Sequence, residues 1–329
     1  MKRLLCVLLA FAVVLCAFTG CGGGNGEETL YPLTVNGTPL DGEIFRYYLD
    51  VAFADPTLSS KDERIRYATE QCIRYVAVNS AFASRGLALT DAETVQTSER
   101  ANALWNMFGV HYKKVGVSKQ TFVKLQTSRS FTERLRHALY DSDGVSPISN
   151  DTLKEYFAGV YVAFKVLRST IYGADVYGNR IPFTDEQLDA VRKKYQNAAD
   201  TINKGAVVDY AFAALISTGS DEMQQSMVTE VIADGDPYYP AGFFGAVHTL
   251  AEGRAGVFVF EDEIFLVYRV AILSDGDLFR RFRETCLTAV SEPYLQNEIN
   301  IMCNGYSSVR STAAVQSCYE TVRQGRNRK

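Results

Sequence analysis

The sequence predicts an α+β protein that is mostly helical, with a small mixed segment inserted between N-terminal and C-terminal helices. Apolar residues recur at helical spacing through residues 41–140, and the period changes to two near Tyr161. Helical spacing returns after residue 277. With 47% hydrophobic and 12% aromatic residues, the chain of 329 residues can bury the cores of about two domains.

Charge and hydropathy exclude two classes of protein. The chain carries 38 acidic and 34 basic residues, which gives a net charge of −4 without long runs of one sign. A basic surface for nucleic acid is therefore not expected. No continuous apolar run reaches the roughly 18 to 20 residues of a spanning helix, so a protein that crosses the membrane several times is not expected either.

Residues 1–20 are predicted to be a signal peptide. Two basic residues precede an apolar run over residues 4–18, and a Thr-Gly-Cys sequence ends at Cys21. This ending resembles a bacterial lipobox, although Phe18 stands where that motif usually has Leu. The resemblance implies that Cys21 is lipidated at the outer face of the cytoplasmic membrane, with residues 21–30 as a lipidated start and flexible tether. The alternative is an uncleaved or plainly secreted N-terminus.

Local signals define the N-terminal helices best. Ser60 is followed three residues later by Glu63, and Thr90 by Glu93, so each pair can form a capping box. Gly86 lies between the two boxes and is expected to end the first helix. Further helices are expected over residues 101–108, 118–125 and 131–139.

The middle of the chain reads as mixed structure. Residues 161–171 alternate at period two and predict a strand, and Thr184 with Gln187 forms a third capping box before another helix. Two apolar runs, over residues 257–260 and 264–270, predict a hairpin. The last predicted elements are a helix over residues 277–304, interrupted near Pro293, and a frayed tail over residues 323–329.

Four cysteines remain once the signal peptide and Cys21 are set aside. They are Cys72, Cys286, Cys303 and Cys318. No pair has the short spacing that zinc sites use, so no metal site is predicted. A disulfide among the last three is compatible with an exported protein, and buried free thiols are the favoured alternative.

Several short stretches occur in an order and spacing typical of one family of exported foldases. They are residues 35–37, 45–49, 83–93, 145–157, 161–167, 203–205, 240–243, 250–253 and 265–270. Together they resemble the SurA and PrsA group, which joins a helical chaperone lobe to a parvulin-type prolyl isomerase domain. The resemblance covers residues 33 to about 300.

The resemblance implies a domain organisation. It predicts a SurA-like helical chaperone domain over residues 31–155 and a parvulin-like domain over residues 156–274. Residues 275–329 would form C-terminal helices that return to the chaperone lobe and end in a basic tail. Parvulins of this group carry one His in the first strand and one in the last, and here those places are held by Lys165 and Leu266, within one residue of register.

The missing His pair bears on catalysis. Prolyl isomerisation needs no metal or cofactor, and none is predicted, because a cleft that favours the twisted amide can lower the barrier by binding alone. Tyr239, Phe243 and Phe244 are the candidate substrate-binding residues, with core packing as their equal alternative. Without the paired His we expect isomerase activity to be weak or absent.

Two functions follow from these patterns. The first is a membrane-anchored chaperone or foldase that binds unfolded, newly exported polypeptides, with a homodimer left open. The second is a solute-binding lipoprotein of a transport system, which the length and anchor fit equally well. Solute-binding proteins need repeated strand-helix-strand units, whereas residues 41–140 are almost purely helical, so the first function is favoured.

Overall fold

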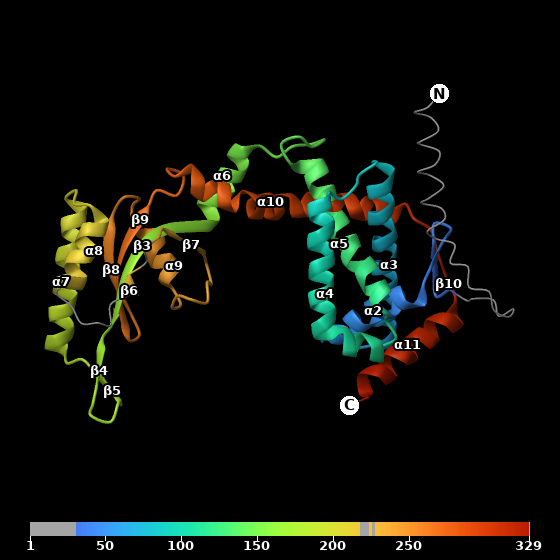
Figure 1. Cartoon of the computed structure of the whole chain (residues 1–329), viewed down its shortest axis with the longest axis horizontal. Coiled ribbons are helices and arrows are strands. Elements are labelled where there is room, and N and C mark those ends of the chain that lie inside the picture. Colours follow the sequence, from blue (N-terminus) through green and yellow to red (C-terminus); the bar gives the residue numbers. More distant parts are fainter. Residues whose placement is uncertain (1–30, 218–223, 226–227, 329) are drawn as a thin grey trace. The chain divides into compact units, whose positions relative to one another are not determined.

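The structure is a computed structural model, and it describes residues 31–217, 224–225 and 228–328 (Figure 1). It is a mostly helical α+β fold with small antiparallel sheets, as the sequence predicts. The predicted signal peptide, the lipidated Cys21 and the tether lie outside the described residues. None of the helices in the described part of the chain has the length and apolar composition that a membrane span requires.

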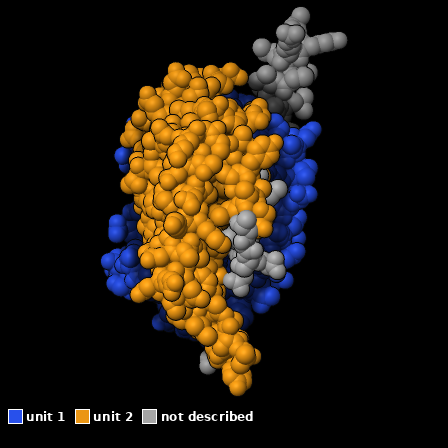
Figure 2. All heavy atoms as spheres, turned by 90° about the vertical axis from the view of Figure 1, so that its left-hand side faces the viewer, with its two compact units in different colours: residues 1–131, 301–329 blue, residues 132–300 orange. Residues whose placement is uncertain are grey.

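Contacts divide the chain into two compact units (Figure 2). Of the described residues, 31–131 and 301–328 form the helical unit, and those between 132 and 300 form the sheet unit. The sequence-based domain boundaries, after residues 155 and 274, stay predictions.

The helical unit contains helices from both ends of the chain. Its elements are β1 (Leu33–Val35), β2 (Thr38–Leu40), α2 (Gly42–Ala54), α3 (Lys61–Ser84), α4 (Asp91–Lys114), most of α5 (Lys119–Tyr140), β10 (Ser308–Arg310) and α11 (Thr312–Asn327). Both predicted capping boxes are confirmed, at Ser60–Glu63 before α3 and Thr90–Glu93 before α4. Gly86 follows α3 with φ of +64°, as a helix-ending glycine does.

Three expectations for these helices were wrong. The box at Thr90 starts one helix that runs to Lys114, and α5 likewise replaces two predicted helices. The C-terminal residues expected to fray belong to α11, which continues to Asn327. Helix α11 packs on α2 and α4, and its core residue Val322 is fully buried, so tertiary contacts order a segment whose sequence alone looks polar.

A three-stranded sheet and the buried carboxylate of Asp50 tie the C-terminal segment into the helical unit. Strand β10 pairs with β1, and β1 with β2, all antiparallel. Asp50 of α2, with its side chain 8% exposed, lies 2.8 Å from Nε2 of His111 on α4. Arg326 of α11 donates to Oδ1 of Asp50 at 2.5 Å and to its backbone oxygen at 3.1 Å. One carboxylate therefore joins three helices.

The sheet unit is built around an antiparallel sheet. Its elements are α6 (Asn150–Val160), β3 (Tyr161–Thr170), β4 (Tyr172–Ala174), β5 (Arg180–Pro182), α7 (Asp185–Asn203), α8 (Val208–Ser217), β6 (Gln224–Gln225), β7 (Glu230–Ala233), α9 (Phe243–Thr249), β8 (Ala255–Phe260), β9 (Glu263–Val270) and most of α10 (Gly276–Asn304). Strand β3 pairs with β9 on one side and with β6 and β7 on the other, while β8 pairs with β9. The predicted strand, the hairpin and the third capping box, Thr184–Gln187, are confirmed.

Helices cover both faces of this sheet (Figure 1). Tyr195 and Phe212, from α7 and α8, pack with Leu167 and Leu266 on one face. The opposite face is aromatic and lies under α9. Its buried core residues are Val162, Phe164, Val166, Ile232, Phe243, Val247, Phe265 and Val267.

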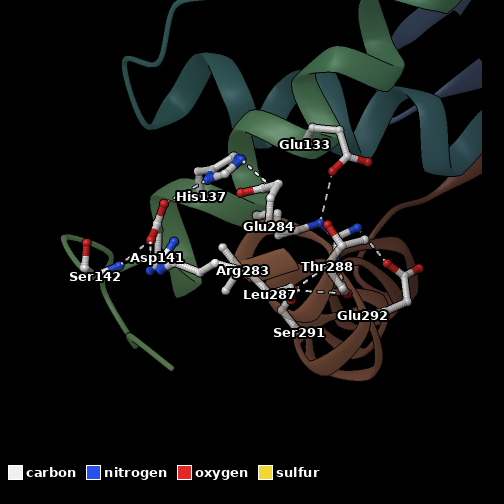
Figure 3. Close-up of polar contacts among 11 residues, drawn as sticks. Glu133, His137, Asp141, Ser142, Arg283, Glu284, Leu287, Thr288, Ser291 and Glu292 are labelled. Carbon is white, nitrogen blue, oxygen red and sulfur yellow. Dashed lines mark hydrogen bonds and ion pairs between the residues drawn. The ribbon is translucent and has the colours of Figure 1, made fainter. Parts of the chain in front are cut away.

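Polar side chains join the end of α5 to α10 within the sheet unit (Figure 3). Arg136 of α5 is 3% exposed and donates to Glu292 at 2.6 Å and to the backbone oxygen of Thr288 at 3.0 Å. Ser291 donates to the oxygen of Leu287. These contacts lie in the turn before Pro293, where α10 continues without the break that the sequence predicts.

Candidate functional site

The aromatic residues proposed from the sequence gather on the α9 face of the sheet. Gly242, with φ of +83°, precedes α9 and directs Phe243 toward the sheet. The Phe243 ring stacks on Tyr239 at 4.4 Å between centroids and contacts Phe164 at 5.4 Å and Phe265 at 5.0 Å. Phe243 is 0% exposed, so in this structure it is a core residue.

Tyr239 and Phe244 form the edge of this cluster, where both are only partly buried. The Tyr239 hydroxyl donates to Oε2 of Glu230 on β7. Burial raises the pKa of Tyr239, and the neighbouring Glu230 carboxylate raises it further, so the phenol stays protonated. The cluster therefore offers apolar surface and one phenol–carboxylate pair.

Lys165 and Leu266 lie on the other face of the sheet. Lys165 pairs in register with Tyr268, and Leu266 with Leu167, so all four side chains point toward α7 and α8. Lys165 contacts both carboxylate oxygens of Asp209, at 2.8 and 3.0 Å, and Leu266 is fully buried. The structure brings Tyr239, Phe243 and Phe244 together but places Lys165 and Leu266 across the sheet from them.

A shift of one residue reverses this placement, because side chains alternate along a strand. Phe164 and Val166 on β3, and Phe265 and Val267 on β9, face the α9 side. All four are apolar, so the one-residue uncertainty in the family alignment does not bring a titratable residue to that face.

The three His residues lie apart from this cluster's core. His111 contacts Asp50 in the helical unit. His137 on α5 lies between Asp141 at 3.0 Å and Glu284 at 3.1 Å (Figure 3). His248 lies on α9, with its ring 5.8 Å from that of Phe244.

An exposed apolar surface on α4 was not predicted from the sequence. Met107 is 66% exposed and Val110 74%, and we call these two residues the α4 apolar surface; Phe108, 49% exposed, lies about 100° around the helix from Met107. Ala101, Trp105 and Gly109 form the buried side of the same helix. Residues two apart on a helix lie about 200° around it, so Met107 points away from the core that Trp105 enters.

The sequence did contain one sign of this surface. Trp105 and Met107 lie two residues apart, a spacing that puts them on opposite sides of a helix. Leu104, Trp105 and Phe108 have helical spacing within the helix expected over residues 101–108, but the structure exposes about half of Phe108. Exposed apolar residues that adjoin one another mark interaction surfaces in soluble domains.

The four remaining cysteines carry no disulfide. Cys72, Cys286 and Cys318 are buried and Cys303 is partly exposed, and all four are free. Burial raises the pKa of the Cys72 thiol well above its usual value, which keeps it protonated and unreactive. Among the described residues, no group of three His, Cys, Asp or Glu side chains is placed to hold a metal ion.

Comparisons with known proteins gave structural similarities alone. The comparisons with protein-family models and with curated proteins found no match. Among solved structures, the foldase protein PrsA of Lactococcus lactis is 12% identical with a TM-score of 0.40, covering 89% of this chain and 99% of that chain.

Two further PrsA structures are similar at lower scores. Foldase protein PrsA of Streptococcus pneumoniae is 11% identical with a TM-score of 0.32, covering 78% of this chain and 83% of that one. PrsA of Bacillus subtilis is 12% identical with a TM-score of 0.27, covering 78% and 82%. Each of these three TM-scores lies below 0.5, so the similarities carry no argument about function.

Proposed function

We propose that this chain is an extracytoplasmic chaperone of the foldase type, anchored to the membrane through Cys21, which binds unfolded exported polypeptides. The α4 apolar surface carries the proposal. Unfolded chains expose apolar side chains that folded proteins bury, and a surface that binds many of them must be apolar and adaptable. Met107 contributes a flexible, polarisable side chain of the kind found on promiscuous binding surfaces.

The packing of α4 supports this role. Trp105 is 9% exposed and its ring lies 5.6 Å from that of Phe122, so the inner side of α4 is fixed. Glu93 and Thr90 cap the start of the helix, and His111 contacts Asp50 near its end. A rigid helix can present apolar residues to a client without losing its own fold.

Prolyl isomerase activity is proposed to be weak or absent. The strands that hold the family's His pair are the central strands β3 and β9. On the α9 side they present apolar residues together with Arg168 and Arg269, and on the α7 side Lys165 is paired with Asp209. At the α9 edge, Tyr239, Phe244, Phe258 and Phe260 are partly exposed and can contact a peptide, whereas Phe243 is fully buried.

The solute-binding alternative finds less support. It expects parallel strands joined through helices. Every strand pair in the described part of the chain is antiparallel.

The experiment measures how well the purified chain suppresses aggregation of a denatured model protein. Met107→Ser with Val110→Ser should raise the amount of chain needed for half-suppression about tenfold, while changing the free energy of unfolding by less than about 0.5 kcal/mol. The matched control is Val176→Ser with Tyr177→Ser, in the β4–β5 hairpin, where the side chains are 92% and 87% exposed.

The control should behave like the unchanged chain. Equal losses in both double variants would mean that any exposed apolar residue suffices, and no loss in the α4 variant would overturn the proposal. Refolding of a protein limited by a prolyl step, followed with the chain at substoichiometric amounts, tests catalysis separately. We expect no acceleration.

A further inference from the structure

Strand β8 is an edge strand with a free outer edge. In the described part of the chain it pairs only with β9, and the backbone groups of Val257 and Val259 that point away from β9 have no hydrogen-bond partner. The backbone N–H of Arg269 donates to the backbone oxygen of Arg254. In β8, the backbone N–H and C=O groups of even-numbered residues therefore point toward β9, and those of odd-numbered residues point away from it. Such an edge is a ready site for pairing with another extended chain.

One residue of this edge is already paired in the way that an added strand would pair. The Asn203 side chain, at the end of α7, accepts from the N–H of Ala255 at 2.8 Å and donates to its oxygen at 3.0 Å. The amide of Asn203 thus occupies both outward groups of Ala255. Val257 and Val259 continue the same edge with equivalent groups that no described residue occupies.

A groove runs beside these two residues. It has a volume of about 350 Å³ and is lined by Arg192, Lys193, Gln196 and Asn197 of α7 and by Val257 and Val259 of β8. Its wall is therefore basic and amide-bearing, and its floor is apolar. Of the acidic residues near the groove, Asp189 lies 3.8 Å from Arg192, Asp262 contacts Arg180 at 3.2 Å and Glu263 lies 3.9 Å from Arg168. Lys193 has no ion-pair partner among the described residues, so the wall keeps a basic side chain for an acidic ligand.

The other side of the edge is aromatic. Phe258 and Phe260 point to the α9 face, where both are partly exposed and pack against the aromatic cluster. A strand added beside β8 would alternate its side chains between these two environments. Every second side chain would meet Arg192 and Lys193, and the ones between would meet Phe258 and Phe260.

We propose that the outer edge of β8 binds an extended polypeptide in which acidic and apolar side chains alternate. Backbone hydrogen bonds to Val257 and Val259 supply affinity, and the two side-chain environments supply selectivity. The site lies in the sheet unit and is distinct from the α4 apolar surface, so it adds a sequence preference to the proposed client binding and does not depend on it.

The test measures binding of fluorescent peptides to the full chain by anisotropy. A short peptide of alternating Glu and Val should bind at least about tenfold more tightly than one of alternating Lys and Val, or than a peptide with the Glu and Val residues in two blocks. Arg192→Glu with Lys193→Glu should reverse the preference between the Glu and Lys peptides.

Val257→Pro tests the backbone contact. Proline removes an outward N–H that makes no bond in the described structure, and edge strands tolerate such a proline. Binding of the Glu–Val peptide should fall at least about tenfold, whereas Val257→Thr, which keeps the N–H, should bind as the unchanged chain does. Equal binding by Val257→Pro and Val257→Thr overturns the proposal.

A second arm keeps the test valid if the proline variant does not fold. N-methylation of alternate residues along one edge of the Glu–Val peptide should abolish binding, and N-methylation along its other edge should not. Equal effects of the two methylation patterns contradict strand addition.

Sedimentation tests a different occupant of the edge. If the chain sediments as a dimer that pairs through β8, and no peptide binds, the edge belongs to a second copy of this chain and the proposal is overturned. Met107→Ser with Val110→Ser should leave peptide affinity unchanged, which separates this site from the proposed client surface.

Discussion

Helices α4 and α9 carry similar apolar runs and use them in opposite ways. In α9, Phe243 and Val247 lie four residues apart and are fully buried against the sheet. In α4, Met107 and Val110 lie three residues apart and are mostly exposed. Both pairs have helical spacing, so the pattern identifies residues that share a side of the helix. Whether that side is covered depends on the element that packs against it.

The difference has a structural cause. Helix α9 has seven residues, too few to be stable alone, and aromatic burial fixes it to the sheet. Helix α4 has 24 residues and is fixed through its other side, by Trp105 and by the contact of His111 with Asp50. Of these two helices, α4 is therefore the one that can expose apolar residues and still keep its place.

The largest expected effect comes from Phe243→Ala. Removing a fully buried ring that contacts Tyr239, Phe164 and Phe265 should lower the free energy of unfolding by about 3–5 kcal/mol. Phe244→Ala, the neighbour on the same helix, should cost only about 1 kcal/mol because Phe244 is partly exposed. Amide hydrogen exchange of β3 and β9 reports the loss. Equal costs for the two variants would mean that α9 does not hold its place through the buried ring.

The next effect concerns the fixed side of α4. Asp50→Ala leaves Arg326 and His111 without their shared carboxylate, and should lower the free energy of unfolding by about 2 kcal/mol, since these two partners are 29% and 42% exposed and water can solvate them. Trp105 is the only tryptophan of the chain, so its fluorescence during urea unfolding reports this unit directly. Asp277→Ala is the control, because its contact with Arg280 is exposed and should matter little. A small effect of Asp50→Ala would mean that Trp105 and its neighbours fix α4 by themselves.

The sequence predicted the features that depend on residues close together in the chain, and it missed those that depend on distant partners. The capping boxes at Ser60, Thr90 and Thr184 depend on residues three apart, and all three are confirmed. Helix α11 depends on α2 and α4, and strand β7 depends on β3; these partners are distant in the sequence, and both elements went unpredicted.

The sequence brought Tyr239, Phe243 and Phe244 together as candidates, but two other properties of the candidate sites could not be predicted, for the same reason. The face of the sheet that Lys165 occupies depends on strand register, which a slip of one residue reverses. The exposure of Met107 depends on which elements cover α4, and no spacing within α4 encodes that. Both properties are set by tertiary contacts.

The smallest expected effect comes from an ion pair, the contact between Asp141 and Arg283 in the sheet unit. Burial alone would raise the pKa of Asp141, but hydrogen bonds from Arg283, from His137 and from the Ser142 backbone outweigh it and lower the pKa to about 2 (Figure 3). A carboxyl whose pKa is lower in the folded chain stabilises the fold above its unfolded pKa of 3.8, and that stabilisation disappears as the pH falls toward 2.

Arg283→Gln tests this contact, whose two side chains are 25% and 28% exposed. At pH 6 the variant should be less stable by about 1 kcal/mol, a figure reduced for solvent screening. The difference from the unchanged chain should shrink between about pH 4 and pH 2, as Asp141 becomes protonated in both proteins. Arg280→Gln, at a 75% exposed position, is the control and should show a smaller difference at every pH. If the difference in stability for Arg283→Gln stays constant from pH 6 to pH 2, the effect comes from the packing of the Arg283 side chain. The ion pair with Asp141 would then add nothing to the stability of the sheet unit.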